Sequence, residues 1–118
     1  MPSGFPYRNK GKSDYWMQFF PVQTITAIAP SAQATAAPIA SDTAYVTVTP
    51  SGGAVKLPSA QAGRVITVIN NGANLLTVWP FLGDNINNVG ANLILVGGIA
   101  TGAILIFYCG SAGMWWSK

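Results

Sequence analysis

The side chains that could carry acid, base or nucleophilic chemistry are few and lie far apart in the sequence. There is no His and no Glu, and the side-chain carboxylates are Asp14, Asp42 and Asp84. General acid–base catalysis needs titratable groups gathered within hydrogen-bond reach of one reacting centre. No such pair can be identified from these positions. The sequence therefore predicts no catalytic residue and no enzyme.

The single cysteine, Cys109, is the remaining candidate nucleophile. It has no second cysteine for an intrachain disulfide and no His to activate it. It follows the apolar run Ala103–Tyr108. Because every second residue of a strand shares a face, its side chain aligns with those of Phe107, Leu105 and Ala103. This pattern predicts a buried, unreactive thiol.

The segment Gly83–Asn88 is the nearest approach to a metal-binding motif. Carboxylate and amide oxygens bind calcium, but the segment lacks the Asp/Asn alternation, the central Gly and the terminal Glu of an EF-hand loop. Asn and Asp also form turns by bonding to their own backbone. We expect an Asx-rich turn at Asp84, with ion binding left open, and we predict no metal site and no cofactor.

The tryptophans in the second half of the chain offer another possible site, an aromatic platform for a sugar or a base. Neighbouring residues of a strand point to opposite faces, which separates Trp115 from Trp116. A Trp at a strand end, such as Trp79, more commonly fills a core or an interface. We therefore expect no small-molecule substrate.

Charge is scarce and unevenly placed. Of 118 residues, 8% are charged and 50% are hydrophobic, against about 25% charged in typical soluble domains. Most of the net charge of +3 comes from a short basic stretch at Arg8–Lys12 and from Lys118. This is less than the basic stripe of a nucleic-acid-binding domain, which argues against direct nucleic-acid binding. An isolated monomer would expose apolar patches, which favours self-association.

Residues 1–40 are expected to form an extended N-terminal arm and linker. The arm carries six aromatic side chains that could anchor it on a partner: Phe5, Tyr7, Tyr15, Trp16, Phe19 and Phe20. Two alternatives are a segment folded back over its own domain and an arm docked on neighbouring subunits. We favour docking because aromatic anchors are typical of interfaces. Within the linker, Gln23–Ala29 predicts a short strand and Ser31–Pro38 an extended connector.

A membrane-associated protein is a further alternative, built around residues 91–109. No charge occurs between Asn85 and Ser117, and Gly98 and Gly102 have the spacing of packed membrane helices. The Asn residues, the Gly97–Gly98 pair and the β-branched bias argue against a spanning helix. The N-terminus has no signal-peptide pattern.

Residues 41–118 are expected to form one small all-β domain. Turn residues separate runs that predict strands at 43–49, 54–57, 64–70, 75–79, 93–96, 103–109 and 114–116. The Asn-Gly dipeptide at 71–72 indicates a hairpin between the third and fourth of these. Both faces of 64–70 are apolar, so cover on two sides is expected. Short strands with such turns are typical of an antiparallel sandwich or jelly roll.

The strand and turn pattern resembles a β-module of tailed-bacteriophage virion proteins. The resemblance rests on Val55–Pro58, Ala60–Gly63, Val65–Asn70, Leu76–Pro80, Gly83–Asn87 and Gly113–Trp115. It implies a structural, commonly homotrimeric protein without enzymatic activity. The aromatic arm, and a chain end two residues after Trp116, favour a capsid decoration, or cement, protein over a tail, collar or fibre-attachment protein.

The resemblance therefore implies the major capsid protein and further copies of the chain itself as partners. It also implies the exterior of the virion capsid as the location, after synthesis in the host bacterial cytoplasm.

Overall fold

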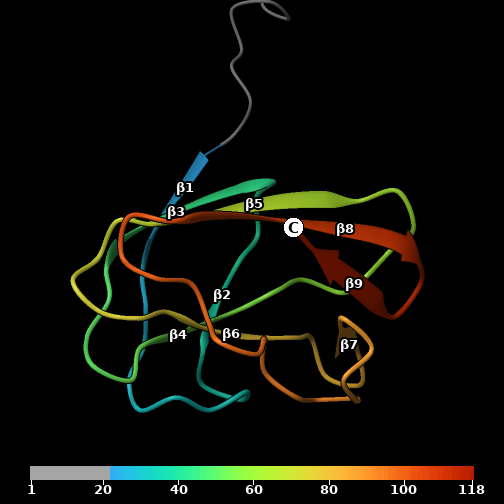
Figure 1. Cartoon of the computed structure of the whole chain (residues 1–118), viewed down its shortest axis with the longest axis horizontal. Helices are drawn as coiled ribbons and strands as arrows, with labels where there is room; N and C mark the ends of the chain where they lie inside the picture. Colours follow the sequence, from blue (N-terminus) through green and yellow to red (C-terminus); the bar gives the residue numbers. More distant parts are fainter. Residues whose placement is uncertain (1–21) are drawn as a thin grey trace, which may run out of the picture.

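A computed structural model describes residues 22–118, which form nine strands and no helix (Figure 1). The strands are β1 (Val22–Thr26), β2 (Ala37–Pro38), β3 (Thr43–Val48), β4 (Ala54–Lys56), β5 (Val65–Asn70), β6 (Thr77–Trp79), β7 (Asn85–Ile86), β8 (Ile104–Ser111) and β9 (Met114–Ser117). The predicted all-β class is confirmed. The aromatic anchors of the arm lie outside the described residues.

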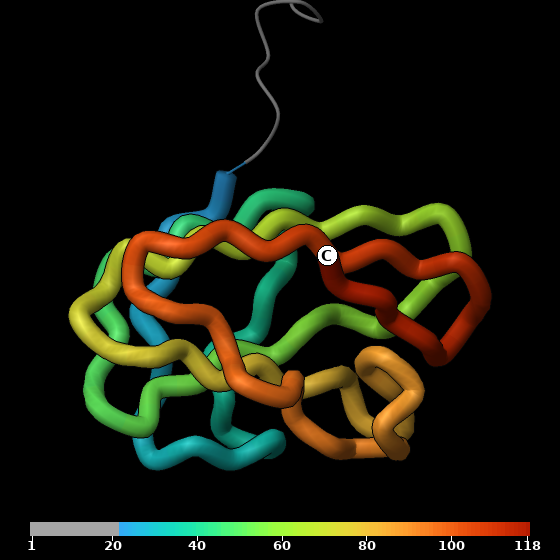
Figure 2. Tube along the Cα trace, viewed as in Figure 1, coloured from blue at the N-terminus to red at the C-terminus, as the bar shows by residue number. Residues whose placement is uncertain are grey.

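The first six strands alternate between two sheets. A six-stranded sheet has the order β1-β3-β5-β8-β9-β7, and a three-stranded sheet has the order β2-β4-β6. The chain thus winds through three coils, β1/β2, β3/β4 and β5/β6, each with one strand in either sheet, and Figure 2 follows this path. Equivalent strands of successive coils run the same way, and β8 then covers the last coil as an antiparallel neighbour of β5.

The predicted antiparallel arrangement is wrong for most of the described strand pairs. Five of the seven pairs are parallel, and both antiparallel pairs involve β8. In the coils, consecutive strands lie in different sheets, so each pairs with a strand one full turn away. The order is therefore not that of a jelly roll, whose neighbouring strands are antiparallel.

The hairpin predicted at Asn71-Gly72 is also wrong, because β5 and β6 belong to different sheets. The segment forms a corner between them. Gly72 packs directly against Thr49, where a Cβ atom would collide with the backbone and side chain of that residue. The buried Asn70 side chain donates hydrogen bonds to the carbonyls of Asn74 and Ile99, at 2.9 and 2.8 Å. These contacts turn the chain toward the second sheet.

Residues 22–40, which we expected to belong to the arm and linker, are part of the folded domain. They supply β1 and β2, and the side chains of Ile25, Ala37 and Ile39 lie in the core. The Gln23 side chain links the two strands, since its Nε2 donates a hydrogen bond of 3.1 Å to the carbonyl of Pro38. The expected boundary at residue 40 therefore falls between β2 and β3, within the folded part of the chain.

The core lies between the two sheets and is built from alternating residues of the strands. Its largest fully buried side chains include Trp115, Phe107 and Leu57. Cys109 is buried in the same row as Phe107, as predicted, and its Sγ lies 3.1 Å from the Ser111 carbonyl.

Residues 93–96, a predicted strand, instead form irregular backbone that passes beside β6 and ends in a turn at Val96. Residues 98–102 are likewise turn and irregular backbone, not the helix that a membrane-helix interpretation of their Gly spacing would require. In the described part of the chain, no helix has the length and apolarity needed to cross a membrane.

Candidate interaction surface

The side of the six-stranded sheet that faces away from the core is the most extensive regular surface on the described chain. Along each strand, buried residues alternate with residues that point outward. We call the outward set the outer sheet face. It consists of Val22, Thr24, Thr43, Tyr45, Val65, Thr67, Ile69, Ile104, Ile106, Tyr108 and Trp116.

Strand register arranges these side chains in rows across the sheet. One row runs Thr24, Tyr45, Ile69, Ile104, and a second runs Val22, Thr43, Thr67, Ile106. A third row places Val65, Tyr108 and Trp116 next to one another. Because the β-sheet aligns residues from distant segments, side chains that are scattered over the sequence form one continuous surface.

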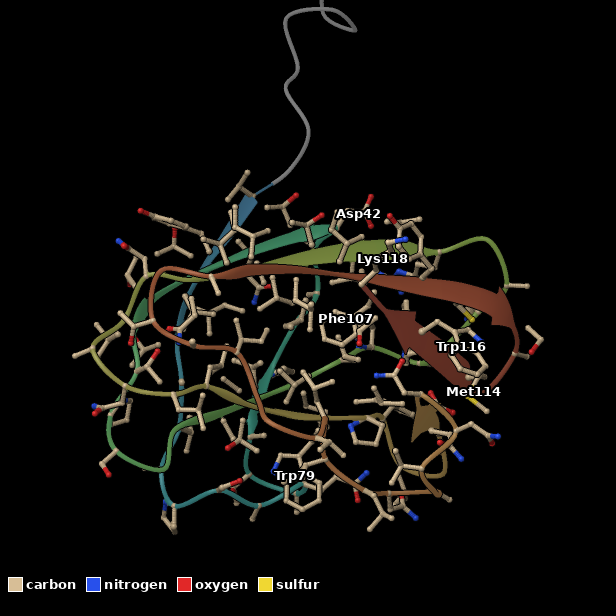
Figure 3. The ribbon with its side chains drawn as sticks, viewed as in Figure 1. Asp42, Trp79, Phe107, Met114, Trp116 and Lys118 are labelled. Atoms are coloured by element: carbon tan, nitrogen blue, oxygen red, sulfur yellow. The ribbon has the colours of Figure 1, made fainter. Side chains whose placement is uncertain are left out.

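The outer sheet face is apolar and carries no charged side chain. Val22 and Ile104 are each 59% exposed and Trp116 is 48% exposed. The polar side-chain groups are hydroxyls and the Trp116 indole N–H, and the Tyr45 hydroxyl accepts a hydrogen bond of 3.0 Å from Asn71 Nδ2. Charge occurs at two positions beside these side chains. Lys118 exchanges two backbone hydrogen bonds with Ile106 and so extends the second row by one residue, and the carbonyl of Asp42 accepts from the Thr67 N–H (Figure 3). Exposed apolar surfaces of this kind are typical of protein interaction sites.

The segment 64–70 was expected to be covered on both faces. Residues 22–118 cover only one of these faces. Its inward residues Ile66 and Val68 are fully buried, whereas Val65 is 43% exposed. The two-sided apolar pattern of this strand was the sequence signal for the outer sheet face. The register that extends the face over five strands could not be predicted from that signal.

A second group of exposed apolar side chains lies on the loops around β6 and β7. It consists of Leu75, Phe81, Leu82, Val89, Leu93, Ile94 and Val96. The loops are held in place by Asn92, whose Oδ1 accepts hydrogen bonds from Gln33 Nε2 at 3.0 Å and from the Gly83 N–H at 2.6 Å. These residues lie on irregular backbone, which gives a less regular surface than the sheet.

The Asp84 carboxylate has a structural partner. Its Oδ2 accepts a hydrogen bond of 2.7 Å from the Ala60 N–H. Within residues 22–118, no group of three or more His, Cys, Asp or Glu side chains is placed to hold a metal ion. Asn87, Asn88 and Asn92 adopt positive φ, the conformation that Asn tolerates in turns. The predicted Asx-rich turn is thus confirmed in part, since the segment contains turns at Gly83 and at Asn87–Asn88 but also the short strand β7 between them.

The three tryptophans of the described chain do not form one aromatic platform. Trp115 is buried and its Nε1 donates to the Pro58 carbonyl at 3.3 Å. Trp116 points to the opposite side of β9, as expected from strand geometry. Trp79 lies on the other sheet, where its Nε1 donates to Ser31 Oγ at 2.9 Å (Figure 3). Only Trp116 contributes to the outer sheet face.

The outer sheet face is assigned as the candidate site on its geometry and composition. No family model, curated protein or solved structure gives a significant match to the chain.

Proposed function

We propose that this chain is a structural protein of a tailed-bacteriophage virion that binds the outside of the assembled capsid and stabilises it. In this role it is a cement, or decoration, protein whose partner is the major capsid protein. The observation that carries the adhesive part of the proposal is the outer sheet face, an uncharged surface continuous over β1, β3, β5, β8 and β9. The virion assignment rests on the strand and turn pattern of residues 55–115.

The residues of that pattern have structural roles in the described chain, which fits a module used for its shape. Val55, Leu57, Val78, Ile86 and Trp115 are among its buried side chains. Hydrogen bonds also join residues from different parts of the pattern. The Trp115 indole N–H donates to the Pro58 carbonyl, and the Ala60 N–H donates to the Asp84 carboxylate. A protein built in this way acts by binding without turnover.

Binding of this kind stabilises a capsid by linkage. A protein that binds only the assembled lattice shifts the equilibrium toward that lattice by mass action. A homotrimer would present three copies of each contact, and simultaneous contacts hold far more tightly than one contact alone. The proposed trimer would also cover apolar surface that a monomer leaves in water.

Residues 1–21 enter the domain at Val22, on the margin of the outer sheet face. We include docking of this aromatic segment on capsid subunits in the proposal, with Trp16, Phe19 and Phe20 as principal anchors. Truncated interface anchors typically cost about 2 kcal/mol or more each. The triple Ala variant at these positions should therefore lower occupancy on particles while the domain stays folded.

The deciding experiment is immunogold electron microscopy of purified virions with antibody against residues 22–118. Label distributed over the whole shell supports a cement protein. Label confined to the neck or the tail would assign the chain to a collar, tail or fibre-attachment role instead. Absence from virions by both microscopy and mass spectrometry would refute the virion proposal.

A second experiment measures capsid stability. Capsids from phage that lack the protein should lose their shape at lower temperature than wild-type capsids, and adding the purified protein should restore their stability.

A further inference from the structure

The two sheets have four edges, and three of them are closed by other parts of the described chain. The edge strands are β1 and β7 in the large sheet and β2 and β6 in the small sheet. An open edge exposes backbone N–H and C=O groups that can pair with another strand. A further strand can therefore add at an edge whose outward backbone groups have no hydrogen-bond partners.

Residues 95–99 close the β6 edge. Leu76 and Ile99 exchange two backbone hydrogen bonds of 2.9 Å each, and the Leu95 N–H donates to the Val78 carbonyl at 2.9 Å. This segment runs antiparallel to β6 and forms hydrogen bonds with its outward backbone groups, as a partner strand would.

The β7 edge is closed by the loop that follows the strand. The carbonyl of Asp84 accepts from the Asn92 N–H at 2.9 Å, and the carbonyl of Ile86 accepts from the Val89 N–H at 3.3 Å. The Asn85 side chain accepts a further hydrogen bond from this loop.

The β2 edge has no free donor at its outward residue. The Ile39 N–H donates to the Lys56 carbonyl at 2.9 Å, which turns Pro38 away from β4. Pro38 has no N–H. Its carbonyl accepts a hydrogen bond of 3.1 Å from Gln23 Nε2.

The β1 edge has none of these closures among residues 22–118. The Ala27 N–H donates to the Val48 carbonyl at 2.9 Å, which fixes the alternation along the strand. The backbone groups of Val22, Thr24 and Thr26 consequently point away from β3. The strand contains no charged residue and no Pro, which are common means of protecting an edge.

We propose that the β1 edge pairs with β1 of a second copy of this chain, antiparallel across a two-fold axis at Thr24. Pairing with a different edge of the second copy would need another open edge, and residues 22–118 provide none. The two-fold register places Thr24 opposite its symmetry mate and Val22 opposite Thr26. The outward N–H and C=O groups of all three residues then have partners.

Side-chain packing supports the same register. Thr24 would lie opposite its symmetry mate and Val22 opposite Thr26, and such cross-strand pairs suit a sheet. The two large sheets would join into one, and the outer sheet faces of the two copies would become continuous. The pairing does not depend on the virion role or on the trimer.

Light scattering of the full chain after size exclusion tests the pairing. The expected mass is that of a dimer, or of a hexamer where the outer sheet face also assembles trimers. Thr24→Pro removes an outward N–H and should halve the mass while the circular dichroism spectrum is retained. Thr24→Val keeps the N–H and should leave the mass unchanged. A wild-type monomer or trimer, or an unchanged mass for a folded Thr24→Pro variant, would overturn the proposal.

A charge exchange tests the register without altering the backbone. Thr24→Lys and Thr24→Glu each place like charges opposite one another and should each halve the mass. An equimolar mixture of the two variants should restore it, since Lys then faces Glu. Failure of the mixture to associate would overturn the two-fold register. A higher mass after deletion of residues 2–20 would show that this segment occupies the edge instead, and would likewise overturn the proposal.

Discussion

The hydroxyl of Thr49 donates a hydrogen bond of 2.8 Å to the Oδ1 of Asn70, and both residues are buried. The same oxygen accepts from the Gly72 N–H at 3.1 Å, while the Asn70 Nδ2 donates to two backbone carbonyls. The amide therefore has a partner at every polar atom. It connects the end of β3, the end of β5, the corner after it and the approach to β8.

Removing this amide should cost much of the domain's stability. Asn70→Ala removes the four hydrogen bonds of the side-chain amide, leaves the buried Thr49 hydroxyl and the Gly72 N–H without this partner, and should lower the free energy of unfolding by about 3–5 kcal/mol. Thr49→Val removes one hydrogen bond and should cost about 1–2 kcal/mol. Asn71→Ala is the matched control, because that side chain is exposed. Chemical denaturation measures all three, and equal losses at Asn70 and Asn71 would contradict this role.

Gly72 should not tolerate a side chain. Its Cβ position is occupied by the backbone and side chain of Thr49, so Gly72→Ala must displace the corner between the sheets. We expect a loss of at least about 3 kcal/mol or failure to fold, as for severe overpacking. Gly110→Ala is the control, since nothing lies within 4 Å of its Cβ position. Thermal melting compares the two variants, and a stable Gly72→Ala protein would show that the corner can move.

Cys109 should resist thiol reagents in the native protein. It is buried in the inner row of β8 and should be labelled rapidly only after unfolding. Cys109→Ala should change stability by about 1 kcal/mol, through packing alone. Ala112→Cys places a second thiol on the exposed turn and provides the control for rapid labelling. Rapid native labelling of the wild-type chain would mean that this inner row is accessible.

The outer sheet face should mediate assembly. Ile104→Lys places a charge on an exposed position at the end of the first row and should alter monomer stability by about 0.5 kcal/mol or less. It should reduce the mass measured by light scattering and weaken binding to capsids. Val96→Lys is the matched control, because Val96 is 74% exposed but lies on the loops beside β6. If only Val96→Lys disrupts assembly, the loop surface is the interface.

The positions of the longer strands could be predicted from the sequence because their signals are local. Alternation and turn residues place β3, β4, β5, β6, β8 and β9 within two residues of their observed ends. The inward phase of Cys109 follows from the same alternation. β2 and β7 contain two residues each, and a segment of that length carries too little pattern to be recognised.

The choice of strand partners could not be predicted, because distant contacts decide it. An Asn-Gly dipeptide between two β-branched runs favours a hairpin by local rules. Here the contact of Gly72 with Thr49, in an earlier coil, turns the segment into a corner. The outer sheet face could not be predicted for the same reason, since its rows depend on the register across several strands.

The winding of the chain through its coils has a consequence for how the protein is made. During synthesis β5 emerges well before β8, and until residues 104–111 leave the ribosome the β5 edge has no cover. Such an edge is a template for pairing with other chains. A product truncated before Ile104 should therefore aggregate, because the β5 edge is covered only once β8 has been synthesised.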